Sequence, residues 1–244
     1  MDNKTLFLDF DGVLFDTIME VYLVNRYLFK GIDFLVPVDK KELSRYSKYK
    51  YLVYNIWMFY YYNPIVFNCQ NEGEIVQEYN FKLSDRNLEK EEQFCSDFLN
   101  ARKKLVENHY NFWKNLEIPY EFFFNIKKIY EEKNADIVVV SKKNKVSILE
   151  RFSTFGFNLP ENKVFAREAL KNYSSKGEFL EEYMKKNLKE SAIFVDDNMN
   201  NLKNINSPKI KTILALWGNN APDDKGLDQK EAIDEIKKFL MQTI

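Results

Sequence analysis

The chain has too few cysteine and histidine residues to build a disulfide framework or a structural zinc site. Its 244 residues include two cysteines, Cys69 and Cys95, and one histidine, His109. Two cysteines form no more than one disulfide, and a structural zinc site takes four cysteine or histidine ligands. The composition therefore excludes both kinds of domain, and it fits a reducing compartment best.

The sequence also lacks an excess of charge of one sign. Lysine and arginine number 36, against 37 aspartate and glutamate residues, which gives a formal net charge of −1 at pH 7. A protein that holds a nucleic acid normally presents a strongly basic surface. We therefore expect no nucleic-acid partner.

Neither a secretory signal nor a membrane span is indicated. Residues 1–4 lead directly into a predicted strand, without an apolar stretch and a small-residue cleavage site, so we expect a cytoplasmic protein. Residues 51–71 form an uncharged run of 21 residues, about the length of a membrane span. Because this run contains Asn55, Asn63 and Asn68, whose amides would be costly to bury in lipid, we expect core helices there and no membrane partner.

Three motifs of common enzyme families are absent. The sequence contains no G-x-x-x-x-G-K-[ST] loop, no G-x-G-x-x-G turn and no H-E-x-x-H. P-loop, dinucleotide-binding and zincin chemistry therefore lack their characteristic residues.

Apolar residues are plentiful and arranged in short runs. With 45% hydrophobic residues the chain can bury a core, and at roughly 150 residues per domain it fits one large domain or one domain with an insertion. Helical patterns alternate with the apolar runs, which predicts an α/β fold with a doubly wound, Rossmann-like parallel sheet. The predicted strands are Thr5–Phe10, Asp136–Ser141, Ala192–Val195 and Thr212–Leu216, and the predicted helices are Val146–Phe155, Glu178–Asn187 and Lys230–Met241.

Residues 17–118 break this alternation and show helical patterns only. We interpret them as an all-helical cap inserted into a core of residues 1–16 and 119–244. The longest cap helix is predicted from about Asp85 to Leu116. Aromatic residues crowd one cap segment, where packing of a core or of a subunit interface is the first interpretation and a substrate-binding wall the second. They are Tyr51, Tyr54, Trp57, Phe59, Tyr60, Tyr61 and Tyr62.

Paired carboxylates follow two of the predicted strands. Asp9 and Asp11 stand where the first strand ends, and Asp196 and Asp197 follow the third. If these strands are neighbours, four carboxylates converge and cannot all stay ionised unless a cation neutralises them. A hard divalent ion with oxygen ligands, most simply Mg²⁺, would do so. The alternative, that Asp-Gly forms an ordinary turn without a metal, stays open at this point.

A lysine and a glycine stand where a helix is predicted to begin. Ser175 and Glu178 fit the capping box S-x-x-E, so Lys176 falls in the first helical turn. A cation there opposes the helix dipole, and Gly177 weakens the helix by about 1 kcal/mol relative to alanine. Two unfavourable residues side by side indicate that a side chain or a close backbone approach serves an anionic ligand, with an ordinary solvated lysine as the alternative.

Ser141 ends the second predicted strand and has two interpretations. It would cap the next helix, as serine commonly does. Alternatively, its hydroxyl and the backbone N–H of Lys142 would hold a phosphoryl oxygen at the positive end of that helix. The two interpretations are compatible.

Four clusters in this order resemble the haloacid dehalogenase-like (HAD) phosphohydrolase superfamily. They are DFDGVLFDT at residues 9–17, VVVS ending at Ser141, SSKG with Lys176, and IFVDDN with Asp196 and Asp197. The match covers about residues 5–216, and the spacing suits a member with a helical, C1-type cap inserted after the first motif.

The resemblance implies a phosphatase that works through an aspartyl-phosphate intermediate. Asp9 would attack the phosphorus of a phosphomonoester. Asp11 would protonate the leaving group and then activate the water that hydrolyses the intermediate. Ser141 and Lys176 would hold the remaining phosphoryl oxygens.

The same resemblance implies a Mg²⁺ site. The ion would bind the Asp9 carboxylate, the Asp11 backbone carbonyl and Asp197, with Asp196 either a direct ligand or one acting through water. Gly12 would let the backbone come close to the phosphate.

The resemblance also limits the substrate and the reaction. Relatives that cleave carbon–halogen bonds generally lack the aspartate at position 11, and P-type ion pumps carry a different pattern after the nucleophile. A phosphomutase and a non-catalytic phosphate-binding relative stay as alternatives. We expect a small phosphorylated metabolite as substrate (a sugar, polyol or amino-alcohol phosphate) and self-association through the aromatic cap surface.

Overall fold

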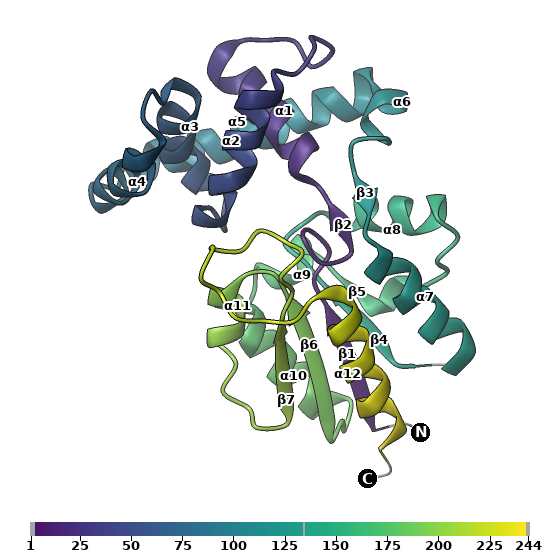
Figure 1. Cartoon of the computed structure of the whole chain (residues 1–244). Helices are drawn as coiled ribbons and strands as arrows, with labels where there is room; N and C mark the ends of the chain where they lie inside the picture. Colours follow the sequence, from purple (N-terminus) through teal and green to yellow (C-terminus); the bar gives the residue numbers. More distant parts are fainter. Residues whose placement is uncertain (1–2, 134, 243–244) are drawn as a thin grey trace. The chain divides into compact units, whose positions relative to one another are not determined.

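The computed structural model describes residues 3–133 and 135–242. The chain divides into a core unit, Met1–Asp16 with Ile118–Ile244, and a helical unit, Thr17–Glu117. Figure 1 labels the elements of both units.

A short antiparallel sheet stands where the chain leaves the core unit and returns to it. Its strands are β2 (Phe15–Asp16) and β3 (Ile118–Pro119), and Asp16 pairs with Ile118. This pairing places Ile118 in the core unit, whereas the sequence assigned it to the cap.

The core unit is built on a five-stranded sheet with parallel strands, which confirms the predicted doubly wound α/β fold (Figure 1). The strand order is β5-β4-β1-β6-β7, so β1 is central and pairs with β4 on one side and β6 on the other. Leu6 of β1 lies opposite both Ile137 and Ile193. The strands are β1 (Lys4–Leu8), β4 (Ile137–Val140), β5 (Val164–Phe165), β6 (Ser191–Asp196) and β7 (Ile210–Leu214).

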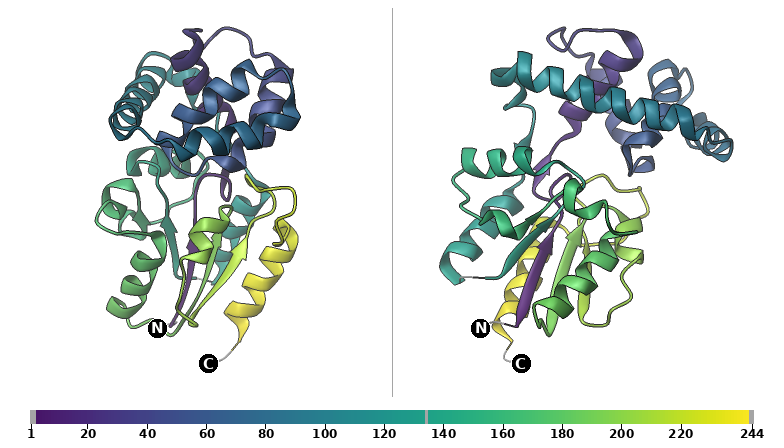
Figure 2. Two further views of the ribbon diagram at one scale, coloured as in Figure 1. Left: turned by 90° about the vertical axis from the view of Figure 1, so that its left-hand side faces the viewer. Right: turned by 180° about the vertical axis from the view of Figure 1, so that it is seen from behind.

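Helices cover both faces of this sheet (Figure 2). Leu6 and Leu8 join a buried cluster with residues of α7, α8 and α12, whereas Phe7 joins a cluster with residues of α10 and α11. Successive strand side chains point to opposite faces, and burial of both faces explains why the run is apolar throughout. The helices are α7 (Glu121–Lys133), α8 (Lys145–Thr154), α9 (Arg167–Leu170), α10 (Lys176–Lys186), α11 (Met199–Lys203) and α12 (Gln229–Met241), with a 3-10 turn η4 (Glu161–Lys163).

The helical unit contains helices and 3-10 turns but no strand within residues 17–117, all of which are described. Side chains from these elements form a single large buried cluster of their own. The elements are α1 (Ile18–Lys30), α2 (Lys40–Tyr49), η1 (Lys50–Leu52), η2 (Ile56–Met58), α3 (Phe59–Asn68), η3 (Glu72–Glu74), α4 (Ile75–Ser84), α5 (Leu88–Asn108) and α6 (Tyr110–Trp113).

The prediction of one continuous helix from about Asp85 to Leu116 is wrong. The chain leaves the helical conformation at His109, where φ is −134° and ψ is 39°, so α5 and α6 are separate. At the other end, the side chain of Asn87 caps α5 by accepting a hydrogen bond from the N–H of Lys90 at 3.1 Å. The polar and apolar pattern continues across the break and therefore does not reveal it.

The uncharged run at residues 51–71 folds as short helical segments that pack on their neighbours. Phe59, Tyr61 and Tyr62 are buried in the cluster of the helical unit, which supports the packing interpretation for these three residues, while Tyr54 is 39% exposed. No helix among the described residues is both long enough and apolar enough to span a membrane.

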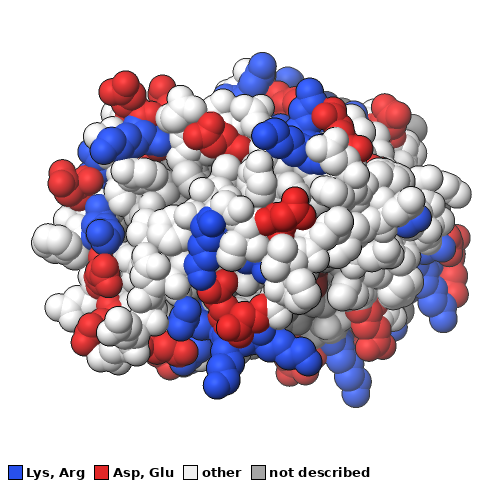
Figure 3. Space-filling model, turned by 90° about the horizontal axis from the view of Figure 1, so that it is seen from above, with Lys and Arg blue, Asp and Glu red and all other residues white. Residues whose placement is uncertain are grey.

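Charged side chains of both signs lie interspersed among uncharged ones on the face drawn in Figure 3. Their totals are nearly equal in the sequence, with 36 basic and 37 acidic residues.

Candidate active site

Polar side chains gather at the carboxyl ends of three neighbouring strands, at the upper end of the sheet in Figure 1. Asp9 directly follows β1, Ser141 directly follows β4, and Asp196 is the last residue of β6. Because β4 and β6 flank β1 on opposite sides, this is a switch point in strand order, where α/β sheets bind their ligands.

Three carboxylates meet at this point. Asp9, Asp196 and Asp197 each place one oxygen within 4.8 Å of the others, and they are only 7%, 0% and 8% exposed. The carboxylate of Asp11 lies apart from this trio, with Oδ1 3.2 Å from the Nζ of Lys143. Since β1 ends before Asp9, strand alternation does not hold both aspartates on one face, and the four expected carboxylates separate into three and one.

Lys176 bridges two members of the trio. Its Nζ lies 2.8 Å from Oδ2 of Asp9 and 2.8 Å from Oδ2 of Asp196, and its side chain is 1% exposed. Burial by itself disfavours an ammonium group, but the carboxylates of Asp196 and Asp9 raise the pKa of Lys176 above its usual value. The alternative of an ordinary solvated lysine is therefore wrong.

The start of α10 places this lysine. As predicted, Lys176 is the first residue of the helix, and Ser175 caps it by accepting a hydrogen bond from the N–H of Glu178 at 3.2 Å. The reciprocal bond of a capping box runs one residue earlier, because the Glu178 carboxylate accepts from the N–H and hydroxyl of Ser174 at 2.7 Å. A Cβ on Gly177 would lie 2.2 Å from the backbone oxygen of Asn204, so helix packing explains the close approach at this glycine.

The carboxyl group of Asp9 has more negative than positive charge around it. Its pKa is raised to about 7, chiefly by burial and also by the neighbouring carboxylates of Asp196, Asp197 and Asp11, while the Lys176 ammonium lowers it. One ammonium therefore does not balance the cluster. The donor atoms are all oxygens of buried carboxylates, which are the ligands that Mg²⁺ prefers, so the residues present fit a divalent cation.

Asp196 accepts four hydrogen bonds. Lys176 and the Asn201 amide donate to Oδ2 at 2.8 and 3.0 Å. The N–H of Asn198 and the same amide donate to Oδ1 at 2.8 and 3.0 Å. A carboxylate has about four lone-pair positions, so these bonds fill them. Donors of the chain itself therefore fix the Asp196 carboxylate in place.

Asp197 is held by a loop that sequence reasoning missed. The backbone N–H and the side-chain amide of Asn219 donate to its Oδ2 at 2.8 and 3.0 Å, and the Asn220 amide donates to its backbone oxygen at 2.8 Å. Added Cβ atoms would lie 1.9 Å from Oδ2 at Gly12 and 2.3 Å from the Asp197 Cβ at Gly218. The sequence Gly-Asn-Asn shortly after the fourth predicted strand was the available signal.

Two features of the folded chain, independent of any phosphate, require glycine at position 12. Its φ of +78° lies in the left-handed region that favours glycine, and the Asp197 carboxylate fills the space of a side chain. The expected close approach to a phosphate is a separate role, which stays a prediction.

Ser141 directly follows β4, the strand that pairs with β1, and is 1% exposed. Its hydroxyl oxygen accepts a hydrogen bond from the N–H of Lys143 at 3.3 Å. Asn144, not Ser141, caps α8 by accepting from the N–H of Ser147 at 2.8 Å, so the helix-cap interpretation of Ser141 is wrong. The hydroxyl therefore lies four residues before α8 rather than at its N-terminus.

Two lysines follow Ser141 and differ in position. Lys142 is exposed to solvent, yet loss of hydration around its amine and repulsion from Lys176 lower its pKa. Lys143 is 8% exposed, and sequence reasoning missed its contact with Asp11. The available sequence signal for Lys143 was its place as a second lysine close to the predicted phosphate-binding Ser141.

The fold is shared with solved structures of bacterial proteins. A predicted phosphatase from Clostridium acetobutylicum has a TM-score of 0.61 at 16% identity, over 99% of this chain and 100% of that one. A predicted phosphoglycolate phosphatase from Haemophilus somnus has a TM-score of 0.61 at 13% identity, over 98% and 99% of the two chains.

A HAD-superfamily hydrolase of subfamily IA, variant 1, from Geobacter sulfurreducens has a TM-score of 0.54 at 13% identity, over 96% and 98% of the chains. No family model and no curated protein matches the sequence. At these identities the likeness establishes the fold, which spans nearly the whole of each chain.

Proposed function

We propose that this chain, which has the fold of the haloacid dehalogenase-like hydrolases, is a Mg²⁺-dependent phosphatase of small phosphomonoesters. The observation that carries the proposal is the buried trio of Asp9, Asp196 and Asp197 with Lys176 bridging two of its members. Three carboxylates and one ammonium leave the cluster with excess negative charge, which suits a site that binds a cation together with a phosphoryl group.

Asp9 is the proposed nucleophile. Both of its oxygens are held, Oδ1 by the N–H of Phe10 at 2.7 Å and Oδ2 by Lys176 at 2.8 Å. One carboxylate oxygen would form a bond to phosphorus while the bond from phosphorus to the ester oxygen breaks, which leaves an aspartyl-phosphate. Asp11 would donate a proton to the departing alkoxide and then take one from the water that hydrolyses the acyl phosphate.

The residues that would hold Mg²⁺ are Asp9, Asp197 and the backbone carbonyl of Asp11, with Asp196 either a direct ligand or one acting through water. When bound, Mg²⁺ supplies the positive charge that keeps the acidic cluster ionised and offsets the charge of a phosphoryl group. Asn219 would orient Asp197 toward the ion, because it fixes one oxygen of that carboxylate.

The remaining phosphoryl oxygens would lie against Lys176, the Ser141 hydroxyl and the backbone N–H of Lys142. Lys176 is placed for this by α10 and Ser141 by β4, so both donors are positioned by rigid elements of the core unit. Fixed donors stabilise a developing charge without the cost of reorganisation.

We propose a small phosphorylated metabolite as the substrate, and a sugar, polyol or amino-alcohol phosphate as its class. One protein of the same fold is a predicted phosphoglycolate phosphatase, so phosphoglycolate belongs in the first panel of esters. The inserted helical unit begins at Thr17, eight residues after Asp9, and we propose that it selects the substrate.

The first experiment measures phosphate release from para-nitrophenyl phosphate and from a panel of small esters, with Mg²⁺ and with EDTA. We expect release that depends on Mg²⁺ and is abolished by Asp9→Asn. No release across a range of pH would instead support a non-catalytic phosphate-binding protein. When a sugar bisphosphate is supplied, an isomerised monophosphate without free inorganic phosphate would support a phosphomutase.

A further inference from the structure

We propose, on the basis of the function proposed above, that Lys143 is a positioning residue that fixes the carboxyl group of Asp11 for proton transfer to the leaving group. The residue stands two positions after Ser141 and belongs to neither the carboxylate trio nor the Lys176 bridge. Its contacts assign it to Asp11.

The ammonium of Lys143 is buried against the loop that carries Asp11. Its side chain is 6% exposed, while that of Asp11 is 39% exposed. The Nζ lies 3.2 Å from Oδ1 of Asp11 and 5.4 Å from the centre of the Phe10 ring, which itself stacks on Phe15. Burial of an ammonium is costly without partners, so these contacts define where the group sits.

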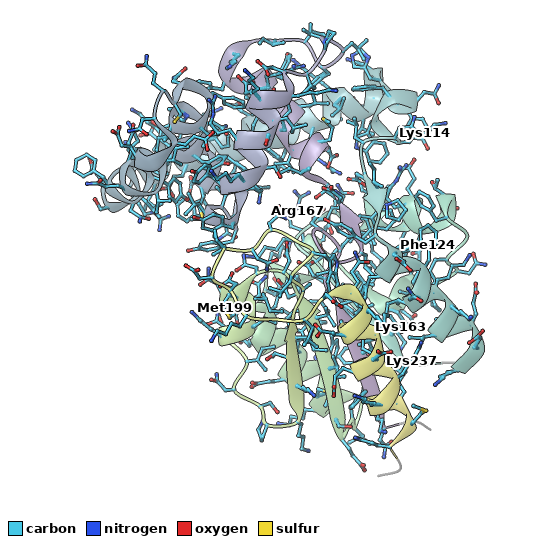
Figure 4. The ribbon with its side chains drawn as sticks, viewed as in Figure 1. Lys114, Phe124, Lys163, Arg167, Met199 and Lys237 are labelled. Carbon is cyan, nitrogen blue, oxygen red and sulfur yellow. The ribbon has the colours of Figure 1, made fainter. Side chains whose placement is uncertain are left out.

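The backbone of Lys143 is fixed on both sides. Its N–H donates to the Ser141 hydroxyl at 3.3 Å, and its carbonyl accepts from the N–H of Arg167 at 3.0 Å. Figure 4 labels Arg167 at the end of the core unit to which the strands' carboxyl ends point. A side chain that starts from a fixed backbone can fix its partner in turn.

The loop that carries Asp11 needs such a partner. The loop closes through the N–H groups of Gly12, Leu14 and Phe15, which donate to backbone oxygens of Phe15 and Phe10 at 2.8 to 3.0 Å. These bonds fix the backbone, but the side chain of Asp11 is the more exposed one and has rotational freedom to lose. The contact with Lys143 selects one orientation of it.

Lys176 and Lys143 thus contact different carboxylates. Lys176 contacts Asp9 and Asp196, and Lys143 contacts Asp11. An ammonium can donate to Oδ1 of Asp11 whether the carboxyl group is ionised or protonated. Oδ2 is then the oxygen that gives its proton to the leaving oxygen and later takes one from water.

This role has a signature that separates it from phosphate binding. A general acid matters when the leaving group is a strong base and matters little when the leaving group departs readily as an anion. A residue that positions the acid should therefore affect phenyl phosphate more than para-nitrophenyl phosphate, two esters of nearly equal shape. A residue that binds the phosphoryl group should affect both alike.

The test compares Lys143→Met, Lys143→Arg and Asp11→Asn with the wild type by kcat/KM, which reports the steps up to release of the phenol. For Lys143→Met we expect a loss that is about 10- to 100-fold larger with phenyl phosphate than with para-nitrophenyl phosphate. Asp11→Asn should show the same preference, and Lys143→Arg should recover most of the loss. Lys128→Met changes an exposed lysine of α7 and serves as the matched control.

Equal losses with both esters in a folded Lys143→Met, checked by thermal unfolding, would overturn the inference, as would no loss at all. If Asp11→Asn shows no preference while the wild type is active, the acid is not Asp11 and the inference falls with that assignment. A wild-type protein that hydrolyses neither ester would contradict the proposed function and the role of Lys143 together.

Discussion

The metal-free protein should become more stable when its proposed nucleophile is neutralised. The pKa of Asp9 is about 7 in the folded chain, against 3.8 for the ordinary group. Between these two values the unfolded chain has lost its proton and the folded chain has kept it, so rising pH favours unfolding. The contribution of Asp9 to stability should therefore fall as the pH rises from about 4 to about 7.

The size of the effect follows from the two pKa values. At about 1.4 kcal/mol for each pH unit, the raised pKa of Asp9 lowers the free energy of unfolding by about 4 kcal/mol at pH 8 and by about 2 kcal/mol at pH 5. Asp9→Asn removes this cost. The variant also loses the carboxylate charge in one of the two hydrogen bonds that Asp9 accepts, and a hydrogen bond to a charged group is worth about 1.5–3 kcal/mol. A net gain of about 1–3 kcal/mol should remain at pH 8, and little or none at pH 5.

The assay is thermal unfolding of both proteins in EDTA at pH 5 and pH 8. At roughly 2–4 °C per kcal/mol for a chain of this size, the Tm difference between variant and wild type should grow by about 5–10 °C from the lower to the higher pH. Comparison of the two proteins at each pH cancels the titration of groups that do not interact with Asp9. A difference that stays constant, or shrinks as the pH rises, would refute the electrostatic reasoning.

Further predictions concern the same cluster. Mg²⁺ at about 100 times its Kd should stabilise the wild type by about 2.7 kcal/mol, with a larger rise in Tm at pH 8 than at pH 5; an equal rise would contradict binding to the ionised cluster. Lys176→Met should abolish turnover and destabilise the chain by about 3–5 kcal/mol, whereas the exposed Lys128→Met should do neither in the same unfolding and phosphate-release assays. Gly12→Ala should destabilise the chain by at least about 1–3 kcal/mol and weaken Mg²⁺ binding, while Gly73→Ala, where an added Cβ would meet no atom closer than 3.4 Å, should leave both unchanged. Asn219→Ala should weaken Mg²⁺ binding about 10- to 100-fold by calorimetry, and unaltered affinity would remove its supporting role.

The sequence pattern predicted the sheet and the place of the site because both depend on short-range signals. Runs such as residues 137–140 are apolar throughout, as a strand covered on both faces must be, and each ends at a polar residue. Once Asp9 and Asp196 follow such strands, the parallel arrangement brings them to one edge of the sheet. Only the neighbour relation of β1 and β6 had to be assumed, and the structure confirms it.

What the pattern did not predict depends on contacts between distant residues. Lys143 and Asp11 are 132 positions apart, and nothing near either residue indicates that one buries its ammonium against the other. The loop with Asn219 reaches Asp197 because β7 lies beside β6, which no local pattern reveals. The two-residue strand β5 is too short to show any alternation.

The close approach at Gly177 has a consequence for how this chain can vary. The atom that a side chain there would strike is the carbonyl oxygen of Asn204, which every amino acid possesses. Position 204 is thus open to many substitutions, whereas any residue other than glycine at position 177 would push the start of α10 outward and carry the neighbouring ammonium away from both of its carboxylates. A position without a side chain and remote from the reacting atoms would then determine the reach of Lys176.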